Sequence, residues 1–207
     1  MCARYEHVLT NLSAIGELIE ECVRIDVQAY EPRPDVRPTD RAPVLYRLEN
    51  ELAVDLFAWG LIPQWSGASG PRPINARIET ISTNRLFGPA LESRRCIVPA
   101  TCFVEWQTVG KRKHLHRIRD AGGGLLAFAG LWEPQHGPGG TRTFTILTGP
   151  PGPVVATLHD RQPVVIPTEL RAAWLAPALQ EGVLSALAEP YPHLDIDGGG
   201  ARQLALF

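Results

Sequence analysis

Short apolar runs rich in valine, isoleucine, phenylalanine and tryptophan recur along this chain, many of them bounded by glycine or proline. Such runs are typical of β-strands, because branched and aromatic side chains pack well on a pleated sheet. Seven runs occupy residues 44–48, 56–62, 96–98, 103–106, 125–131, 144–147 and 164–166. The sequence therefore predicts an α+β fold that is β-rich and carries peripheral helices. With 207 residues and 44% hydrophobic content, one domain can bury its own core.

Helices are predicted at three places outside these runs. Apolar residues at three- and four-residue spacing near the start of the chain predict an amphipathic helix, with Asn11 or Ser13 able to cap it. A second helix is expected in only part of its segment, because Gly88 and Pro89 interrupt the pattern. The helical segments are 9–22, parts of 80–94, and 168 to about 187.

Clusters of glycine and proline mark the turns and loops. Four prolines forbid a regular helix over residues 30–43 and predict an extended loop there. Two hairpin turns are expected, at 120–124 and 136–140, each between two predicted strands. No internal repeat divides the chain, so we expect one domain over residues 1–207 with a loosely ordered tail from about residue 190.

The charge composition limits the binding partners only weakly. A net charge of −2 and a pI near 6.3 do not fit a broadly basic surface for nucleic acid, although they leave room for a local basic groove. Lys111 and Lys113 are the only lysines among twenty basic residues, and the others are arginines. Arginine suits bidentate contacts to phosphate, but a composition bias of the source genome explains the excess equally well.

The four cysteines indicate neither a redox motif nor a metal site. They form no CxxC pair and have no histidine partners at zinc-binding spacing, so we expect no metal and no cofactor. Cys22, Cys96 and Cys102 are interpreted as small core residues. No charged leader opens the chain and no apolar run approaches the roughly 20 residues that span a bilayer. We therefore expect a soluble, cytoplasmic protein without a membrane partner.

Cys2 follows the initiator Met1, and this position gives it a chemistry that no internal cysteine has. Removal of Met1 would leave a thiol and an α-amine on one carbon framework, with ordinary pKa values of about 8.5 and 8. An aldehyde can form an imine with this amine and then be trapped by the sulfur as a five-membered thiazolidine. Alternatively, Cys2 merely follows the start codon and has no role.

Five blocks of sequence place polar groups in otherwise apolar surroundings. They are MCARY at the N-terminus, AWGLIPQW at 58–65, INARIET at 74–80, RRCIVPATCFVEWQ at 94–107 and LHDRQP at 158–163. In this order they resemble the SOS-response-associated peptidase (SRAP) family over nearly the full chain. The resemblance implies a single SRAP-like domain with a mixed, barrel-like sheet that binds single-stranded DNA. It also implies autocatalytic loss of Met1 and a covalent thiazolidine between Cys2 and the ring-opened aldehyde of an abasic site.

Two residues are candidates for proton transfer in this chemistry. Glu105 lies between Val104 and Trp106 in a predicted buried strand, where desolvation would raise the pKa of its carboxyl. Alternatively, its side chain points to solvent; the resemblance favours catalysis, because FVEW matches the family's block. His159 lies in a polar turn, and imidazole can accept and donate protons at neutral pH, although a lone histidine is more often structural. The other five histidines are interpreted as structural or merely exposed.

Asn75 and Arg77 are candidates for holding the reacting groups. The Asn75 amide can contact the N-terminal amine and a substrate oxygen together, although asparagine is also common in turns and caps. Arg77 shares a strand face with Asn75 and can pair with a phosphate next to the reacting sugar. Alternatively, Glu79 neutralises Arg77 in an ordinary surface ion pair.

The remaining candidates are DNA contacts in the blocks that resemble the family. Arg4 and Arg161 are candidate phosphate ligands, and Thr148 is expected to hydrogen-bond a phosphate. Trp65 can present a face on which a base stacks, although tryptophan in such a run is usually core. Pro38 is expected to line the cleft.

Two other functions remain open at this stage. A thiol peptidase or hydrolase would use Cys2 as nucleophile, with His159 or Glu105 as base. A noncatalytic DNA-binding module would use the arginines and Trp65 to hold a strand, and Cys2 would be incidental. We expect a monomer whose partner is single-stranded DNA with abasic sites. One departure from the family concerns the expected cleft, since Asp35 stands where asparagine is common.

Overall fold

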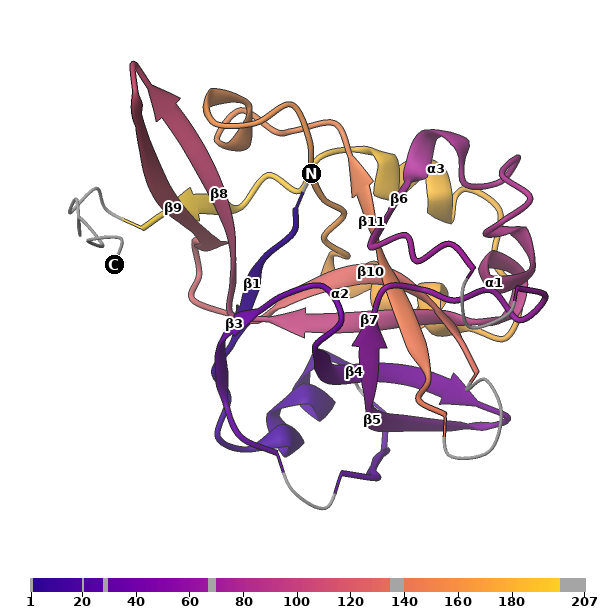
Figure 1. The fold of residues 1–207 in the computed structure, drawn as a ribbon. Helices are drawn as coiled ribbons and strands as arrows, with labels where there is room; N and C mark the ends of the chain where they lie inside the picture. Colours follow the sequence, from indigo (N-terminus) through magenta and orange to yellow (C-terminus); the bar gives the residue numbers. More distant parts are fainter. Residues whose placement is uncertain (1, 20, 28–29, 67–69, 135–139, 198–207) are drawn as a thin grey trace.

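Thirteen strands of the described chain form two β-sheets (Figure 1). The structure, a computed structural model, describes residues 2–19, 21–27, 30–66, 70–134 and 140–197. One sheet has the strand order β13-β9-β8-β1-β3 and the other β12-β11-β10-β7-β4-β5-β2, with β6 beside β11. The first contains β1 (Tyr5–His7), β3 (Arg33–Val36), β8 (Cys102–Val109), β9 (Arg112–Asp120) and β13 (Leu194–Ile196). The second contains β2 (Val23–Ile25), β4 (Arg41–Leu48), β5 (Glu51–Trp59), β6 (Asn75–Arg77), β7 (Arg95–Ala100), β10 (Leu126–Glu133), β11 (Thr143–Gly149) and β12 (Gln162–Pro163).

The larger sheet is mixed and ring-like, as expected. Most neighbouring strands are antiparallel, but β11 pairs in parallel with both β5 and β6, and β2 pairs in parallel with β5. Because β11 contacts both β10 and β5, strands β5, β4, β7, β10 and β11 form a closed series of pairings. The α+β class with few helices is confirmed.

Two groups of buried side chains form the core. One group is aromatic, and Tyr5, Trp59, Phe103 and Phe128 are completely or almost completely buried within it. Tyr5 carries the start of the chain into this group, since its ring packs edge-on against Trp59 and Phe128. Burial of large aromatic side chains is among the strongest stabilising contributions in a core. The aromatic group therefore fixes the position of β1, immediately after Cys2.

The cysteine expectations were correct for two residues and wrong for one. Cys96 and Cys102 are buried, but Cys22 is exposed. The helical pattern that placed Cys22 on an apolar face ends earlier than predicted, at Leu18. The segment forms a 3₁₀ helix, η1 (Leu12–Leu18), capped as predicted by the Asn11 side chain, which accepts from the Ser13 amide. Its buried residues recur every three positions, which matches three residues per turn.

The remaining helices lie where expected but with different limits. Helix α1 (Gly88–Ser93) begins at the glycine and proline that were expected to interrupt it, because proline fits the first turn of a helix. The segment after 168 divides into α2 (Thr168–Leu175) and α3 (Val183–Ala188), with Gly182 at positive φ before α3. Two further 3₁₀ helices are η2 (Ile78–Thr80) and η3 (Val155–Thr157).

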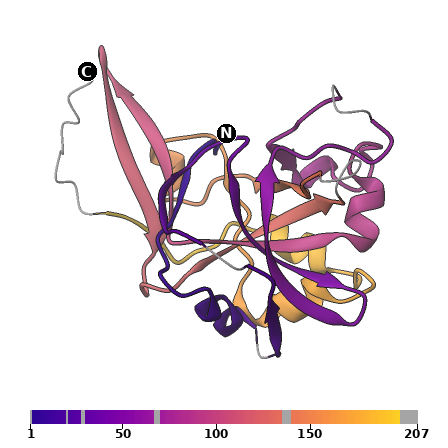
Figure 2. The ribbon, with the colours of Figure 1, turned by 60° about the horizontal axis from the view of Figure 1, so that its bottom comes forward.

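The expected hairpins need correction. Residues 120–124 form a turn, but β9 and β10 on its two sides belong to different sheets. Most of the other expected turn, 136–140, lies outside the described residues. Strands β8 and β9 form a hairpin that the pattern did not predict, with Gly110 at positive φ in its turn. We call this hairpin the arm, because both views show it projecting away from the larger sheet (Figures 1 and 2).

The start of the chain lies between the arm and strands β6 and β11 in both views. Strand β1 pairs with β8 of the arm and with β3, so the first residues enter a space with sheet structure on two sides. Strand β6 lies on the other side, held by its parallel pairing with β11. None of the helices in the described ranges is both long and apolar enough to cross a membrane.

Candidate active site

Cys2 is completely buried at the start of the chain. Its thiol donates to the Arg4 carbonyl oxygen at 3.6 Å. Burial raises the pKa of the thiol to about 12, and the negative charge of Glu105 adds to this effect. In the chain that still carries Met1, the sulfur is therefore a protonated thiol at neutral pH and a weak nucleophile.

Asn75 holds the backbone of Cys2. The side-chain amide of Asn75 donates to the Cys2 carbonyl oxygen at 2.7 Å. Strand β6 positions this amide because Asn75 is aligned with Ile146 of β11. The Asn75 Oδ1 atom is buried and accepts no hydrogen bond from the described part of the chain. The amide therefore orients Cys2 with its donor and keeps an acceptor available.

Glu105 points into the protein from β8, and only 6% of its surface is exposed. Its neighbour Trp106 is 43% exposed, so this strand turns the carboxyl inward and the indole outward. Burial raises the pKa of the Glu105 carboxyl, and the charge of His159 opposes this shift in part. Oε1 of Glu105 has no hydrogen-bond partner among the described residues. The alternative of a glutamate pointing to solvent does not fit these observations.

We refer to Cys2, Asn75 and Glu105 as the thiol cluster. Asn75 and Glu105 each keep a buried oxygen atom without a partner among the described residues, which is costly and unusual in a folded protein. The cluster joins segments separated by roughly one hundred positions in the sequence, and β1 and β8 bring two of them together directly. Three of the four predicted catalytic residues are thus adjacent.

The fourth predicted residue, His159, lies in the loop after η3. Its Nδ1 atom is 2.9 Å from an Asp160 carboxylate oxygen and 3.0 Å from the Arg161 backbone amide, which donates to it. Because the charge of His159 influences the pKa of Glu105, the imidazole lies within electrostatic reach of the thiol cluster. An imidazole and a carboxyl in this relation can transfer protons to and from one substrate.

Arg161 is buried and its hydrogen bonds are directed to other protein groups. Its guanidinium makes a bidentate pair with Glu79 at 2.7 and 2.9 Å. It also donates to the Thr148 carbonyl at 2.6 Å and to the Thr148 hydroxyl at 3.3 Å. The hydrogen bonds from Arg161 are the first cause of the lowered pKa of Glu79. We call Arg161, Glu79 and Thr148 the arginine cluster.

The arginine cluster affects two of the predicted DNA contacts, Thr148 and Arg77. Thr148 is fully buried, and its hydroxyl lies between Arg161 and the Ala76 carbonyl. Glu79 pairs with Arg161 and not with Arg77. Arg77 is exposed and makes no ion pair with any described residue, so it is open to a ligand. Arg77 therefore keeps the character of a phosphate ligand more clearly than Arg161 does.

Arg4 is held by an acidic neighbour. Its Nε atom is 2.5 Å from Asp35, and Arg37 approaches the other Asp35 oxygen at 2.7 Å. Burial opposes ionisation of Asp35, but the hydrogen bonds from Arg37 and Arg4 outweigh it and lower the pKa of this carboxyl. Pro38 lies in the following turn and is half-buried.

The two tryptophans of the AWGLIPQW block have opposite environments. Trp59 is buried and its indole donates to the Ile74 carbonyl at 2.8 Å. Trp65 is 67% exposed, the highest exposure among the large apolar side chains that the structure describes. An exposed indole can stack on a base, as predicted for Trp65.

The sequence did not reveal that His116 lies next to this site. His116 is the direct cross-strand neighbour of Glu105 in the arm, and its Nε2 atom is buried without a partner among the described residues. Residues directly opposite in an antiparallel pair share one face of the sheet. If the hairpin turn at Gly110 had been predicted from the sequence, its register would have placed the side chains of Glu105 and His116 next to each other.

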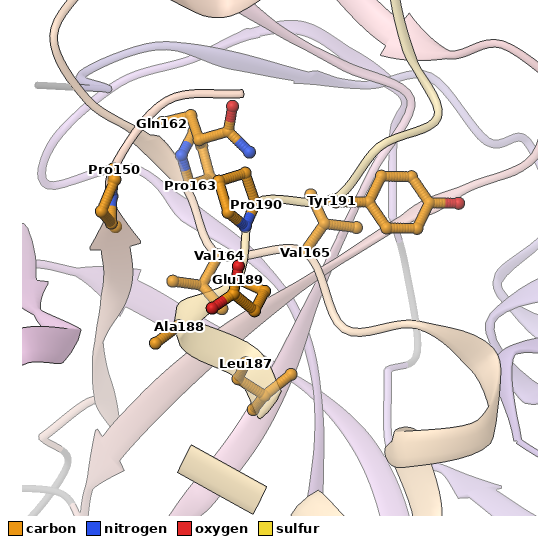
Figure 3. Close-up of a pocket in the computed structure, with 11 residues that line it drawn as sticks. Pro150, Gln162, Pro163, Val164, Val165, Leu187, Ala188, Glu189, Pro190 and Tyr191 are labelled. Carbon is orange, nitrogen blue, oxygen red and sulfur yellow. The ribbon is translucent and has the colours of Figure 1, made fainter. Parts of the chain in front are cut away.

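Two cavities of the structure are lined by residues outside the thiol cluster. The smaller one has a volume of about 10 Å³, which is room for about one water. Its lining includes Gln162, Pro163, Leu187 and Tyr191 (Figure 3). A larger cavity of about 230 Å³ is lined by residues that include Trp59 and Arg72. No group of three or more potential metal ligands is found in the described ranges.

Comparisons with known proteins show the family to which this chain is similar. The sequence model of a family described as SOS response associated peptidase (SRAP) matches residues 1–198. The abasic site processing protein YoqW of Bacillus subtilis (strain 168) is 34% identical over 207 residues, covering 95% of this chain and 90% of that protein. The abasic site processing protein YedK of Escherichia coli (strain K12) is 29% identical over 84% of this chain and 79% of its own length.

A solved structure has the same fold. A crystal structure of a protein from Bacteroides thetaiotaomicron superimposes with a TM-score of 0.78 at 23% sequence identity. The superposition covers 93% of this chain and 90% of the other. At this identity the likeness concerns the fold alone.

Proposed function

This chain belongs to the SOS response associated peptidase (SRAP) family, and from that premise we propose that it processes abasic sites in single-stranded DNA. In the proposed reaction, the chain loses Met1 and Cys2 then forms a thiazolidine with the ring-opened aldehyde of the lesion. The observation that carries the proposal is the thiol cluster. It holds the backbone of Cys2 through Asn75 and places the carboxyl of Glu105 close enough to influence the thiol.

Met1 removal comes first, because the nitrogen of Cys2 is an amide until then. Water adds across the peptide bond between Met1 and Cys2, methionine leaves with the carboxyl group, and Cys2 keeps the amine. Glu105 can accept a proton from water and return it to the departing nitrogen, since burial raises the pKa of its carboxyl and makes it a stronger base than an exposed glutamate. Asn75 keeps the Cys2 backbone in place throughout.

The new amine then attacks the aldehyde carbon of the opened sugar to give a carbinolamine. A proton from Glu105 or His159 lets the hydroxyl leave as water and forms an imine. The sulfur of Cys2 adds to the imine carbon, the thiol proton moves to nitrogen, and a five-membered ring closes. The overall change joins one aldehyde and one aminothiol with loss of one water. Because the product stays attached, each protein molecule reacts once.

The high pKa of the Cys2 thiol supports this order of events. Before Met1 is lost, burial keeps the sulfur protonated and unreactive towards other electrophiles. Loss of Met1 places an ammonium group beside the sulfur, and a neighbouring positive charge lowers the pKa of a thiol. The nucleophile therefore becomes active only when the amine that shares its ring is also present.

The same observations speak against a thiol peptidase that cleaves other proteins. Such an enzyme needs a thiolate within hydrogen-bond reach of a base. The Cys2 sulfur instead donates to the backbone carbonyl of Arg4, so the structure does not show the thiolate–base pair that such an enzyme uses. A passive DNA-binding module would not require the unpartnered polar atoms of the thiol cluster either.

Intact mass measurement with abasic single-stranded DNA tests the proposal. Purified protein should have lost the mass of one methionine residue, and incubation should add the mass of the DNA minus one water. On a denaturing gel the same sample should give a slowly migrating covalent species. Cys2→Ala should give no stable product, while Cys22→Ala is a matched control, because Cys22 is an exposed free cysteine and Cys2 a buried one.

Two results would overturn the proposal. One is active protein that still carries Met1, since the blocked nitrogen cannot form an imine. The other is protein without Met1 that leaves abasic DNA unmodified under conditions in which it binds the strand.

A further inference from the structure

The arm carries an uncompensated positive charge at its tip. Residues 106–119 contain five lysines and arginines and no acidic residue, in a chain whose net charge is −2. The two arginines near the base of the arm are paired, Arg117 with Glu6 at 2.6 Å and Arg119 with Asp197. The remaining three, Lys111, Arg112 and Lys113, are exposed and make no ion pair with any part of the chain that the structure describes.

The folded core does not require this tip. The residues from Thr108 to His114 are exposed, and Val109 is 56% exposed although it is apolar. A two-stranded hairpin gains little stability by itself. Both views show the arm extending away from the rest of the chain (Figures 1 and 2). A projecting basic hairpin with few core contacts is typical of an interaction surface for an anion.

One face of the arm continues directly from the thiol cluster. Along β8, Glu105, Gln107 and Val109 share a face, because side chains alternate along a strand. Their cross-strand neighbours on the same face are His116, His114 and Arg112. We call this set the inner face. The Gln107 amide donates to the Thr157 carbonyl at 3.2 Å, so the inner face is directed towards the loop that carries His159.

The other face of the arm has a different character. It carries Trp106 and Thr108 of β8 opposite Leu115 and Lys113 of β9. Arg112 and Lys113 are therefore adjacent in sequence and equal in charge, but they point to opposite sides of the arm. This pair provides a test that separates a contact on the inner face from a general effect of charge.

We propose that the inner face of the arm binds the sugar-phosphate backbone of the DNA strand beyond the lesion, with Arg112 as the phosphate ligand. The proposal rests on the function proposed above, because it places the lesion at Glu105. Val109 lies four positions after Glu105, which is about 13 Å of extended strand. At about 3.4 Å per stacked nucleotide, this distance corresponds to about four nucleotides.

Continuity with the thiol cluster identifies DNA as the occupant. A strand whose abasic sugar reaches Cys2 must leave the site along one of its walls, and the inner face is a wall with cationic groups at its end. Arginine binds phosphate in a bidentate manner, and the exposed guanidinium of Arg112 has no competing carboxylate in the described chain. Arg161, by contrast, is already paired with Glu79.

The test measures reversible binding of DNA without a lesion to the full chain carrying Cys2→Ala, so that no covalent product interferes. Two oligonucleotides of about 4 and about 16 nucleotides cover the range of single-strand footprints. Arg112→Glu should weaken binding of the long oligonucleotide about tenfold and change binding of the short one less than about twofold. Lys113→Glu is the matched control and should weaken long-strand binding less than about threefold. Arg112→Lys should restore most of the lost affinity, and thermal denaturation should show that all variants fold.

Salt dependence gives a second measure. Each phosphate contact to a single strand contributes about 0.7 to the slope of log affinity against log salt, so Arg112→Glu should reduce the slope by about that amount or more. Equal effects of Arg112→Glu and Lys113→Glu would overturn the proposal, because they would indicate only a general effect of charge. No effect of either substitution on DNA binding would also overturn it. So would an Arg112→Glu variant that binds DNA normally but has lost binding to an acidic protein.

The outcomes separate this proposal from the proposed function. If wild-type protein crosslinks a short abasic oligonucleotide but Arg112→Glu binds long strands normally, the arm proposal is wrong and the function stands. If the arm substitution weakens long-strand binding but no crosslink forms with wild-type protein, the function is wrong and the arm still binds DNA.

Discussion

The thiol cluster and the arginine cluster lie close together but satisfy their polar groups in opposite ways. Glu105 and Asn75 keep buried oxygen atoms without partners among the described residues, and the neighbouring His116 keeps a nitrogen. In the arginine cluster, by contrast, Arg161 makes bidentate bonds to Glu79 and further bonds to Thr148. Unpartnered buried groups cost folding free energy, so the thiol cluster is the part of the site organised for a substrate. The arginine cluster is organised to hold β11, η2 and the His159 loop together.

The largest expected effect concerns the chemistry of the thiol cluster. Glu105→Gln should slow crosslinking about 10²–10⁴-fold, which is the usual contribution of a positioned acid or base. The same substitution should change the free energy of unfolding by less than about 1 kcal/mol, because Glu105 Oε1 has no protein partner to lose. Single-turnover gel assays and chemical denaturation measure the two quantities. Loss of stability with an unchanged rate would reverse the roles of the two clusters.

The arginine cluster should give the opposite result. Arg161→Ala should lower the free energy of unfolding by about 2 kcal/mol, since it removes several hydrogen bonds from a buried guanidinium. The loss should be smaller than for a fully buried pair, because the Glu79 side chain is 40% exposed and can be solvated by itself. Chemical denaturation measures the change, with Arg85→Ala as an exposed control. A stable Arg161→Ala protein that has lost DNA affinity would make Arg161 a phosphate ligand after all, as the sequence predicted.

Sequence patterns predicted the central strands well because their side chains alternate or run as continuous apolar segments, as in β7 and β10. They did not predict β1 and β6, which have only three residues each and are held by pairing with strands far along the chain. The positions of Cys2 and Asn75 depend on those short strands. The motif blocks therefore identified the residues, while only the tertiary pairing brought them together.

The arginine cluster was beyond the reach of local patterns for a related reason. Arg161 and Glu79 are 82 positions apart, so nothing near either residue indicates their pairing. As the alternative to a phosphate contact, the sequence suggested that Arg77 pairs with Glu79, two residues away, because only local neighbours were visible. The burial of Glu105 was predicted correctly from the apolar residues around it, but the exposure of the next residue, Trp106, was not.

A smaller effect should appear in the dependence of stability on pH, where the two clusters have opposite signs. The pKa of Glu105 is raised on folding, so the folded chain binds more protons than the unfolded one above the ordinary glutamate pKa of about 4.3. Its ionisation therefore removes stability as pH rises from there through the raised pKa. The pKa of Glu79 is lowered, so its contribution is present above the ordinary value and is lost as pH falls through the lowered pKa.

Denaturation of wild type, Glu105→Gln and Glu79→Gln across this range measures both contributions. Glu105→Gln should remove the fall in stability above the ordinary glutamate pKa, and Glu79→Gln should remove part of the loss at lower pH. If both substitutions altered the same pH range in the same direction, the contrast between the clusters would not hold.

The smallest expected effect concerns Arg4, which combines features of both clusters because it is paired with Asp35 yet lies near the reactive end of the chain. Asp35→Asn should leave stability within about 1 kcal/mol of wild type, since both side chains are 29% exposed and such pairs contribute little. It should also free Arg4 and Arg37 to bind phosphate, and raise affinity for single-stranded DNA about threefold at low salt. Fluorescence anisotropy at two salt concentrations measures the change, with Asp26→Asn as a control that removes a carboxylate paired with Arg24. An equal gain from both substitutions would indicate net charge alone, whereas a gain confined to Asp35→Asn would place Arg4 or Arg37 on the DNA path and leave Asp35 as the residue that limits binding there.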